Sequence, residues 1–387
     1  MVRLSSLLQG RGVKLALVTQ SYYPRFGGVT EHVEHSAREL RARGHEVTIV
    51  TGRPPGHRAP DPEGVVRLGT SIMVPFQGAF VDLTLGPYLR RDLSQLWSER
   101  TFDLVHVHQP LTPTLPLLTG ETATAPVIGT FHAAGARSRL FRFFRKPLTR
   151  HFERLSGRVA VSHAALRFAD DHFPGDYRVI PNGVDVRRFH PDVPPRPELA
   201  DGRLNVLFVG RLDPRKGLPV LLEALPELRR RVPEARLVVV GDSFLRPWLE
   251  RRLAGRDREH VVFAGSVPPA ALASYYASAH VAVSPATRNE SFGIVLLEAM
   301  ASGKALVASD IPGYRAVVEH GADGLLVPPG DAAALADALA ALLRDPARRL
   351  AFGARGRAKA EGYGWPAVTD RLEAYYREVL TGDARAS

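Results

Sequence analysis

The sequence contains no cysteine and only three methionines among its 387 residues. The absence of cysteine excludes disulfide scaffolds, thiolate zinc sites, iron–sulfur clusters and cysteine nucleophiles. No apolar run approaches the roughly 20 residues that a membrane-spanning helix needs, and the first residues lack the apolar core of a signal peptide. We therefore expect a cytoplasmic, globular protein whose length suffices for about two to three domains.

Positive charge is concentrated in the first half of the chain. The 51 Lys and Arg exceed the 40 Asp and Glu, which gives a net charge of +11. Residues 1–190 hold 25 of the basic and 16 of the acidic residues, and segment 137–158 has eight basic residues beside one acid, interleaved with Phe and Leu. This pattern is typical of a surface that binds anionic lipid or nucleic acid; a helix with a solvated basic face is the alternative. Because no nucleic-acid reading motif accompanies the segment, we expect no nucleic-acid partner.

Short apolar runs alternate with helical patterns in both halves of the chain. This alternation predicts an α/β protein with two Rossmann-like, doubly wound parallel-sheet domains. A charged, Pro-rich segment at 188–203 predicts a linker. We expect one domain of residues 1–187 plus a C-terminal helix at about 366–387, and another of residues 204–365. The clearest expected strands are residues 14–20, 45–51, 102–108, 126–131 and 158–162 in the first domain and 204–210, 236–241, 261–265, 280–284 and 305–309 in the second.

Two loops that follow predicted strands have residues suited to phosphate. Gly27 and Gly28 follow the first strand and open a helix, where backbone N–H groups favour an anion, although a simple tight turn is the alternative. Arg211 and Lys216 belong to GRLDPRKG, directly after the first strand of the second domain. Two fixed cations there suit a diphosphate, while ordinary surface charge is the alternative.

The string NESFGIVLLEAMASG at 289–303 carries two acids at a fixed spacing. Glu290 precedes a helix opened by Ser291, Phe292 and Gly293, and Glu298 lies a little over two turns into it. A carboxylate in that place can accept hydrogen bonds from sugar hydroxyls while neighbouring backbone N–H groups bind phosphate. The alternative is an acid near the helix N-terminus together with a solvated helix residue.

Three histidines lie in or directly after predicted strands. His132 ends one strand at its carboxyl end, where it is either a structural hydrogen-bonding residue or part of a site. His106 and His108 alternate along another strand and share a face. No third ligand is evident, so we expect no metal site and interpret this pair as structural or cleft-lining.

Taken together, these strings resemble retaining glycosyltransferases of family 4, whose GT-B fold places two Rossmann-like domains face to face across a cleft. The resembling elements run in family order: the Gly27-Gly28 loop, the TFH that ends at His132, IPNGVD at 180–185, GRLDPRKG, and ESFGIVLLEAMASG. Within the family, LVHVHQP, GTFHAAGARS and RVAVS are similar to the bacterial phosphatidylinositol mannosyltransferases.

The resemblance implies roles for individual residues. A nucleotide-sugar site is implied for Gly27, Gly28, Arg211, Lys216, Glu290, Ser291, Phe292, Gly293, Ile294 and Glu298, and catalytic roles for His132, Arg211, Lys216 and Glu290. Acceptor or membrane contacts are implied for Tyr22, Tyr23, Arg137, Arg139, Arg142, Arg145 and Lys146. No tightly bound cofactor is implied, and a divalent cation would at most stimulate.

The implied reaction is transfer of a hexose, with retention, from a nucleotide diphosphate sugar to a hydroxyl of a membrane-associated acceptor. Mannose from GDP-mannose, a phosphatidylinositol-type lipid and a peripheral location at the inner face of the cell membrane follow from the subfamily. Ser21, Pro24, Ala133 and Ala134 depart from its acceptor pattern. A UDP-sugar with a soluble or polysaccharide acceptor therefore stays open, as does a nucleotide-sugar epimerase, and no oligomeric state is predicted.

Overall fold

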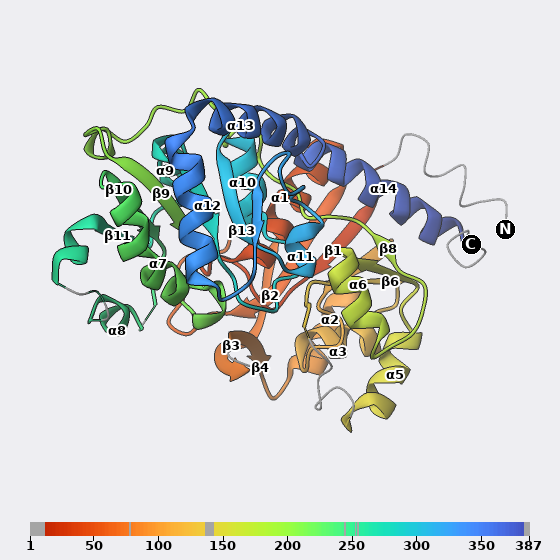
Figure 1. Cartoon of the computed structure of the whole chain (residues 1–387). Helices are drawn as coiled ribbons and strands as arrows, with labels where there is room; N and C mark the ends of the chain where they lie inside the picture. Colours follow the sequence, from red (N-terminus) through yellow and green to blue (C-terminus); the bar gives the residue numbers. More distant parts are fainter. Residues whose placement is uncertain are drawn as a thin grey trace. The chain divides into compact units, whose positions relative to one another are not determined.

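The computed structural model describes residues 12–76, 79–135, 143–243, 245–251, 253 and 255–382. The chain divides into two compact units, Met1–Asn182 with Trp365–Ser387, and Gly183–Gly364 (Figure 1). The helix at the C-terminal end thus belongs to the first unit. The segment expected as a linker groups with the second unit and contains one short 3-10 turn, Pro197–Leu199.

The described part of the first unit contains a sheet in the order β4-β3-β2-β1-β5-β6-β7-β8. Its neighbours pair in parallel except for β3 and β4, which form an antiparallel hairpin. This hairpin was not expected, because polar Arg67, Ser71 and Thr84 occupy buried positions and obscure the apolar alternation of its strands. The strands are β1 (Lys14–Val18), β2 (Glu46–Arg53), β3 (Val65–Phe76), β4 (Ala79–Leu85), β5 (Leu104–His108), β6 (Val127–Phe131), β7 (Gly157–Ala160) and β8 (Arg178–Val179).

Helices cover both faces of this first sheet. One face packs against α1 (Gly28–Ala42) and α14 (Trp365–Thr381), in a core that joins Leu15 and Leu17 to Leu372 and Tyr376. The other face packs against α2 (Leu89–Glu99), α3 (Leu115–Thr122), α5 (Arg145–Glu153) and α6 (His163–Asp170). The face under α1 and α14 is therefore closed by segments far apart in sequence.

The second unit has a parallel sheet in the order β11-β10-β9-β12-β13-β14 within its described residues. The order reverses between β9 and β12, and ligands of doubly wound sheets bind at such a switch point. The strands are β9 (Leu204–Val209), β10 (Ala235–Val240), β11 (Val261–Gly265), β12 (Val281–Ser284), β13 (Ala305–Ser309) and β14 (Leu325–Val327). The helices are α7 (Leu218–Arg231), α8 (Arg246–Arg251), α9 (Pro269–Ser278), α10 (Ile294–Ala301), α11 (Pro312–Arg315), α12 (Ala332–Arg344) and α13 (Pro346–Glu361).

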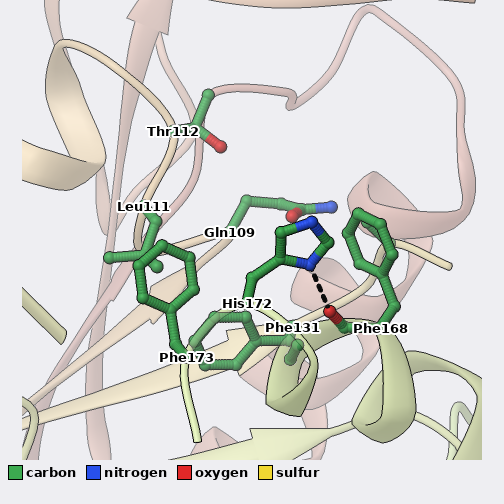
Figure 2. Close-up of a pocket in the computed structure, with 9 residues that line it drawn as sticks. Gln109, Leu111, Thr112, Phe131, Phe168, His172 and Phe173 are labelled. Carbon is green, nitrogen blue, oxygen red and sulfur yellow. Dashed lines mark hydrogen bonds between the residues drawn. The ribbon is translucent and has the colours of Figure 1, made fainter. Parts of the chain in front are cut away.

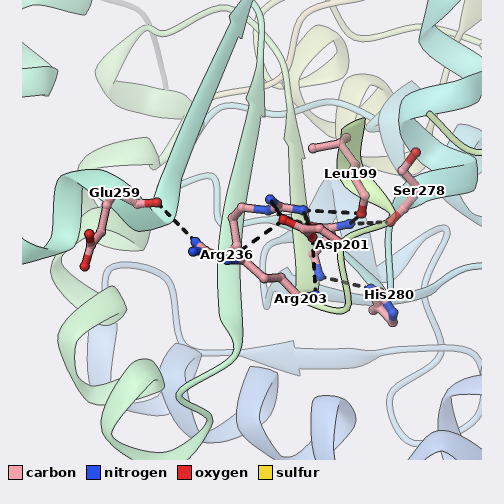
Figure 3. A network of polar contacts seen from close by, with 8 residues as sticks. Leu199, Asp201, Arg203, Arg236, Glu259, Ser278 and His280 are labelled. Atoms are coloured by element: carbon pink, nitrogen blue, oxygen red, sulfur yellow. Dashed lines mark hydrogen bonds and ion pairs between the residues drawn. The ribbon is translucent and has the colours of Figure 1, made fainter. Parts of the chain in front are cut away.

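A buried arginine ties the segment before β9 to the second sheet (Figure 3). Arg236 of β10 is only 5% exposed, and its guanidinium donates to both carboxylate oxygens of Asp201 at 2.8 and 2.9 Å. The same group donates to Asn205 Oδ1, whose amide nitrogen donates to the carbonyls of Leu199 and Ser278. Removing the Arg236 guanidinium would leave the buried Asn205 Oδ1 without its donor and the half-exposed Asp201 without its ion-pair partner.

Arg236→Leu should destabilise the second unit. Loss of several charge-assisted hydrogen bonds costs about 2–3 kcal/mol, which corresponds to a melting temperature lower by roughly 5–10 °C for a unit of this size. The half-exposed Arg203, which bonds the carbonyl of Glu259, provides the matched control. Arg203→Leu should shift the melting temperature by about 2 °C or less, and equal shifts in a thermal scan would contradict the role given to Arg236.

Candidate active site

Two loops meet at the switch point of the second sheet. The loop after β9 carries Lys216, and the loop after β12 carries Glu290. Lys216 Nζ donates to Glu290 Oε2 at 2.9 Å, and both side chains are largely buried, at 22% and 11% exposure. The backbone of Thr287 donates to the carbonyl of Arg215 at 2.8 Å, which joins the two loops beside the ion pair. The two motifs found separately in the sequence therefore form one charged site.

Glycine permits this close approach. Gly217 has φ of +78°, and a Cβ atom there would lie 1.8 Å from the carbonyl oxygen of Pro285. Any other residue would force the two loops apart and strain the backbone. The position of Lys216 next to Glu290 thus depends on the residue that follows it.

The start of α10 lies between the two acids of the 289–303 string. Gly293 has φ of +87°, and a Cβ there would lie 2.6 Å from the ring of Tyr314. Phe292 is buried in the core at 3% exposure, so only its backbone is available to a ligand. Ser291 and Ile294 are partly exposed. The arrangement leaves the backbone N–H groups at the α10 N-terminus next to Glu290, where they favour an anion.

Glu298 and Arg211 have different surroundings from the Lys216–Glu290 pair. Tyr276 donates through its hydroxyl to Glu298 Oε2 at 2.8 Å, and burial together with this carboxylate raises the tyrosine pKa well above its usual value. Arg211 is 53% exposed and lies 3.5 Å from Asp213. Glu298 is thus held by a neutral hydroxyl, whereas Arg211 remains accessible.

In the first unit, the Gly27-Gly28 loop opens α1 as expected. Open space surrounds the position that a Cβ of Gly27 would occupy. Tyr22 is buried at 6% exposure and donates to Glu34, and Tyr23 donates to Glu31 Oε1 at 2.6 Å. Burial and these carboxylates raise the pKa of both phenols. The two tyrosines expected as acceptor contacts therefore bond to carboxylates on α1.

Four imidazoles gather on the sheet face beneath α1 and α14. His32 comes from α1, His106 and His108 from β5, and His132 follows β6. His108 Nδ1 lies 2.9 Å from His132 Nε2, and the ring of His32 lies 5.2 Å from each of these rings. His106 bonds instead to Tyr376 and Thr130, at 2.6 Å each. The sequence singled out His106, His108 and His132 but not His32, and it did not indicate that they form one cluster, because its members lie on different elements.

Burial keeps these imidazoles neutral. Desolvation, followed by the interactions among the rings, lowers the pKa of His108 and His132 well below the usual value. The pKa of His32 falls to about 4 and that of His106 to about 3 for the same main reason. Among the described residues no group of three or more His, Asp or Glu is placed to hold a metal ion. The cluster therefore provides neutral hydrogen-bonding groups.

An apolar pocket lies on the opposite face of the first sheet from the four imidazoles (Figure 2). Its cavity volume is about 40 Å³, and it is lined by Gln109, Leu111, Thr112, Phe131, Ala133, Phe168, Ala169, His172 and Phe173. His172 Nδ1 donates to the carbonyl of Phe168 at 2.7 Å, the dashed line in Figure 2. Gln109, the residue after β5, has φ of +59°. The pocket lies at the carboxyl ends of β5 and β6, and no sequence motif indicated it.

The start of α5, which lies within the basic segment 137–158, is exposed. Arg145 and Lys146 are exposed, as are the rings of Phe143 at 80% and Phe144 at 45%. Arg137, Arg139 and Arg142, which we expected to contribute, lie outside the described residues. Within the part of the chain that the structure describes, no helix is both long and apolar enough to cross a bilayer.

Comparison with known proteins shows the family to which the chain belongs. Residues 26–188 match the model described as Glycosyltransferase Family 4, and residues 191–359 match Glycosyl transferases group 1. The chain belongs to the family 4 glycosyltransferases and is a glycosyltransferase.

Curated relatives cover nearly the whole chain. It is 38% identical over 359 residues to the phosphatidyl-myo-inositol mannosyltransferase of Mycolicibacterium smegmatis. The aligned region covers 91% of this chain and 90% of the relative. It is 33% identical to the D-inositol 3-phosphate glycosyltransferase of Kineococcus radiotolerans, with 91% of each covered.

Solved structures agree with the expected fold. The sucrose-phosphate synthase of Thermosynechococcus elongatus superposes with a TM-score of 0.75 at 24% identity, covering 96% of this chain and 100% of that one. The Anabaena protein HepE in complex with UDP-glucose gives 0.75 at 20% identity, covering 94% and 99%. The predicted family, GT-B fold class and enzyme class are confirmed, and the roles of individual residues stay predictions.

The neutral histidines predict loss of stability at mildly acidic pH. Their folded-state pKa values lie below the unfolded value of about 6.5, so below that pH the unfolded chain takes up protons that the folded chain cannot. Each group lowers the unfolding free energy by up to about 1.4 kcal/mol per pH unit as the pH falls from 6.5 towards the folded pKa, about 4 for His32 and about 3 for His106.

Urea unfolding at pH 7.5 and pH 5, followed by tryptophan fluorescence, measures this slope. Trp365 stacks on His35 and lies edge-on to His32, so its emission reports on the first unit. His106→Phe removes one of the neutral imidazoles and should make the pH dependence shallower, even though the variant is less stable at pH 7.5. An unchanged slope would contradict the assignment of His106 as neutral.

Proposed function

We propose that this protein transfers mannose from GDP-mannose to a hydroxyl group of a phosphatidylinositol lipid, with retention at the anomeric carbon. The observation that carries the proposal is 38% identity, over nine-tenths of the chain, to relatives named phosphatidyl-myo-inositol mannosyltransferase. Two features of the chain support it, the charged site of the second unit and the exposed basic helix of the first. The proposal requires no tightly bound cofactor, and a divalent cation would at most stimulate.

The charged site supports a nucleotide diphosphate sugar as donor. A diphosphate would bind Lys216 in place of Glu290, with the accessible Arg211 as a second cation and the α10 N-terminus as a third source of positive potential. Glu290, released from Lys216, can then accept hydrogen bonds from sugar hydroxyls. The ion pair keeps both groups in place while the site is empty.

These groups define the proposed chemical step. The bond between the anomeric carbon and the diphosphate oxygen breaks, and the acceptor oxygen bonds to the same face of that carbon. The acceptor proton passes to the departing phosphate oxygen, so no protein carboxylate has to form a covalent sugar intermediate. Lys216 and Arg211 stabilise the negative charge that develops on the diphosphate, which is where preorganised cations lower a barrier.

The start of α5 supports a lipid acceptor. Arg145 and Lys146 stand beside exposed Phe143 and Phe144, and this combination of cations and aromatic rings suits an anionic bilayer surface. The apolar pocket lined by Phe131, Phe168 and Phe173 adds a second apolar feature in the same unit. We place the protein at the inner face of the cell membrane as a peripheral enzyme.

A soluble inositol phosphate is the second candidate acceptor. Relatives named D-inositol 3-phosphate glycosyltransferase are 33% identical to this chain. In the first loop, Ser21, one of the departures from the subfamily's acceptor pattern, bonds to Asp82, and Arg25 forms an ion pair with the same carboxylate. A UDP-sugar is the corresponding alternative donor.

Product analysis separates these candidates. The protein is incubated with GDP-mannose or UDP-glucose, and with phosphatidylinositol vesicles, inositol 3-phosphate or no acceptor. We expect a mannolipid from GDP-mannose and phosphatidylinositol. Transfer to inositol 3-phosphate alone would replace the proposed acceptor, and an isomerised sugar nucleotide without acceptor would indicate an epimerase.

Lys216→Ala should lower the rate of mannose transfer by about 10²–10³-fold, because one preorganised group facing the leaving diphosphate is lost. The matched control is Arg258→Ala. Arg258 is 61% exposed, pairs with Glu250 and precedes β11, at the amino edge of the same sheet. Radiolabelled transfer at saturating donor gives both rates, and full activity of the Lys216 variant would exclude the diphosphate role.

The double substitution Arg145→Ser, Lys146→Ser should weaken binding to anionic vesicles about 10- to 30-fold at low salt, since each cation near a membrane surface contributes about 1 kcal/mol. Arg371→Ser, Arg377→Ser removes the same charge from α14, on the opposite face of the first sheet. Vesicle sedimentation compares the two. Equal binding by both variants would exclude α5 as the membrane contact.

A further inference from the structure

Among the described residues, the ring of His132 has one polar partner, and that partner is another histidine. His108 Nδ1 lies 2.9 Å from His132 Nε2. His108 is 1% exposed, and its other ring nitrogen, Nε2, is buried without a hydrogen-bond partner. His132 is 9% exposed, more than the other three imidazoles of the cluster. The bond therefore connects a fully enclosed ring to one near the surface of its unit.

The unpartnered nitrogen decides which histidine donates. If His132 donated, His108 would carry its proton on Nε2, and a buried N–H would have no acceptor. If His108 donates through Nδ1, its Nε2 carries no proton and is an acceptor without a partner instead. A buried donor without a partner is rarer in proteins than an acceptor without one, and it costs about 1–3 kcal/mol. The arrangement with His108 as donor is therefore favoured.

Both rings stay neutral in this arrangement. His32 and His106 surround His108, with ring centroids at 5.2 and 4.5 Å, and a proton added to any of the four would be desolvated and repelled by the next. Asn182 Oδ1 lies 2.9 Å from His32 Nδ1, and the cluster is closed by Trp365 and Tyr376 of α14. Desolvation first, and neighbouring histidines second, lower the pKa of all four groups. A neutral imidazole has one donor and one acceptor, so fixing one nitrogen fixes the other.

We propose that His108 is a positioning residue, which donates from Nδ1 to His132 Nε2 and so holds His132 in the tautomer that carries its proton on Nδ1. His132 then presents an uncharged N–H donor to a sugar or acceptor hydroxyl at the reaction centre. The first half of the proposal concerns the protein alone, and the second half rests on the proposed function.

The nitrogen resonances of histidine test the bond directly. In the whole protein labelled with ¹⁵N-histidine, two-dimensional spectra that correlate ring nitrogens with ring carbon-bound protons distinguish a protonated from an unprotonated nitrogen. We expect the His132 signal, assigned by its loss in His132→Phe, to show protonated Nδ1 and unprotonated Nε2 at pH 7.5. A proton on Nε2 of His132 would overturn the proposal.

Two substitutions of His108 separate positioning from packing. His108→Phe keeps the ring volume and removes the donor, whereas His108→Asn is smaller but places an amide nitrogen where Nδ1 was. We expect His108→Phe to lose the single tautomer of His132 and to transfer mannose about 10- to 100-fold more slowly, and His108→Asn to retain both within a few-fold. If packing alone mattered, the smaller Asn would be the more damaging change.

His106→Phe is the matched control from the same strand. His106 is equally buried but bonds to Tyr376 and Thr130, so its loss should lower stability and leave the His132 tautomer as in the wild type. Equal effects of the His106 and His108 substitutions on that tautomer would overturn the proposal. If the wild-type protein transfers nothing to phosphatidylinositol, the proposed function fails, while the nitrogen spectra still decide whether His108 orients His132.

Discussion

The first unit depends on the packing of α14 against a sheet made more than 180 residues earlier in the chain. Trp365, Leu372 and Tyr376 bury their apolar surface against β1 and α1, and the hydroxyl of Tyr375 bonds to the backbone of β7 at Arg158. Gly157 allows the contact, because a Cβ there would lie 2.8 Å from that hydroxyl. Without this helix, the imidazoles below it would meet water and lose the burial that keeps them neutral.

The two units place their polar groups by the same rule but use different chemistry. In each unit, polar groups lie at the carboxyl ends of parallel strands: His108 and His132 end or follow β5 and β6, and Lys216 and Glu290 follow β9 and β12. The second unit brings together a cation and a carboxylate, Lys216 and Glu290, which suits a charged ligand. The first unit brings together uncharged imidazoles beneath α1 and α14, which suits hydrogen bonding to a neutral hydroxyl. This division agrees with a donor that carries a diphosphate and an acceptor that reacts through a hydroxyl.

Much of this arrangement could be predicted from the sequence, and the exceptions have physical causes. The alternating apolar runs located most strands within a residue or two, as at Ala305–Ser309, because buried parallel strands are short and continuously apolar. The β3–β4 hairpin was not predicted, because several of its buried positions are polar. The motifs indicated Lys216 and Glu290 separately, but their pairing depends on the approach of Gly217 to Pro285, which is a tertiary contact. The bond between His108 and His132 joins neighbouring strands 24 residues apart and has no local pattern.

The division of the chain also sets an order of assembly during synthesis. Residues 183–364 form a continuous unit with its own core, so they contain what they need to fold as they leave the ribosome. The first sheet is made before them, yet α14, which covers one of its faces together with α1, emerges after them. During that interval the apolar face with Leu15, Leu17 and Ile128 lacks the part of its cover that α14 provides. The unit that begins the chain is therefore the last to be completed, and its partly uncovered face is the surface that a chaperone would have most reason to bind.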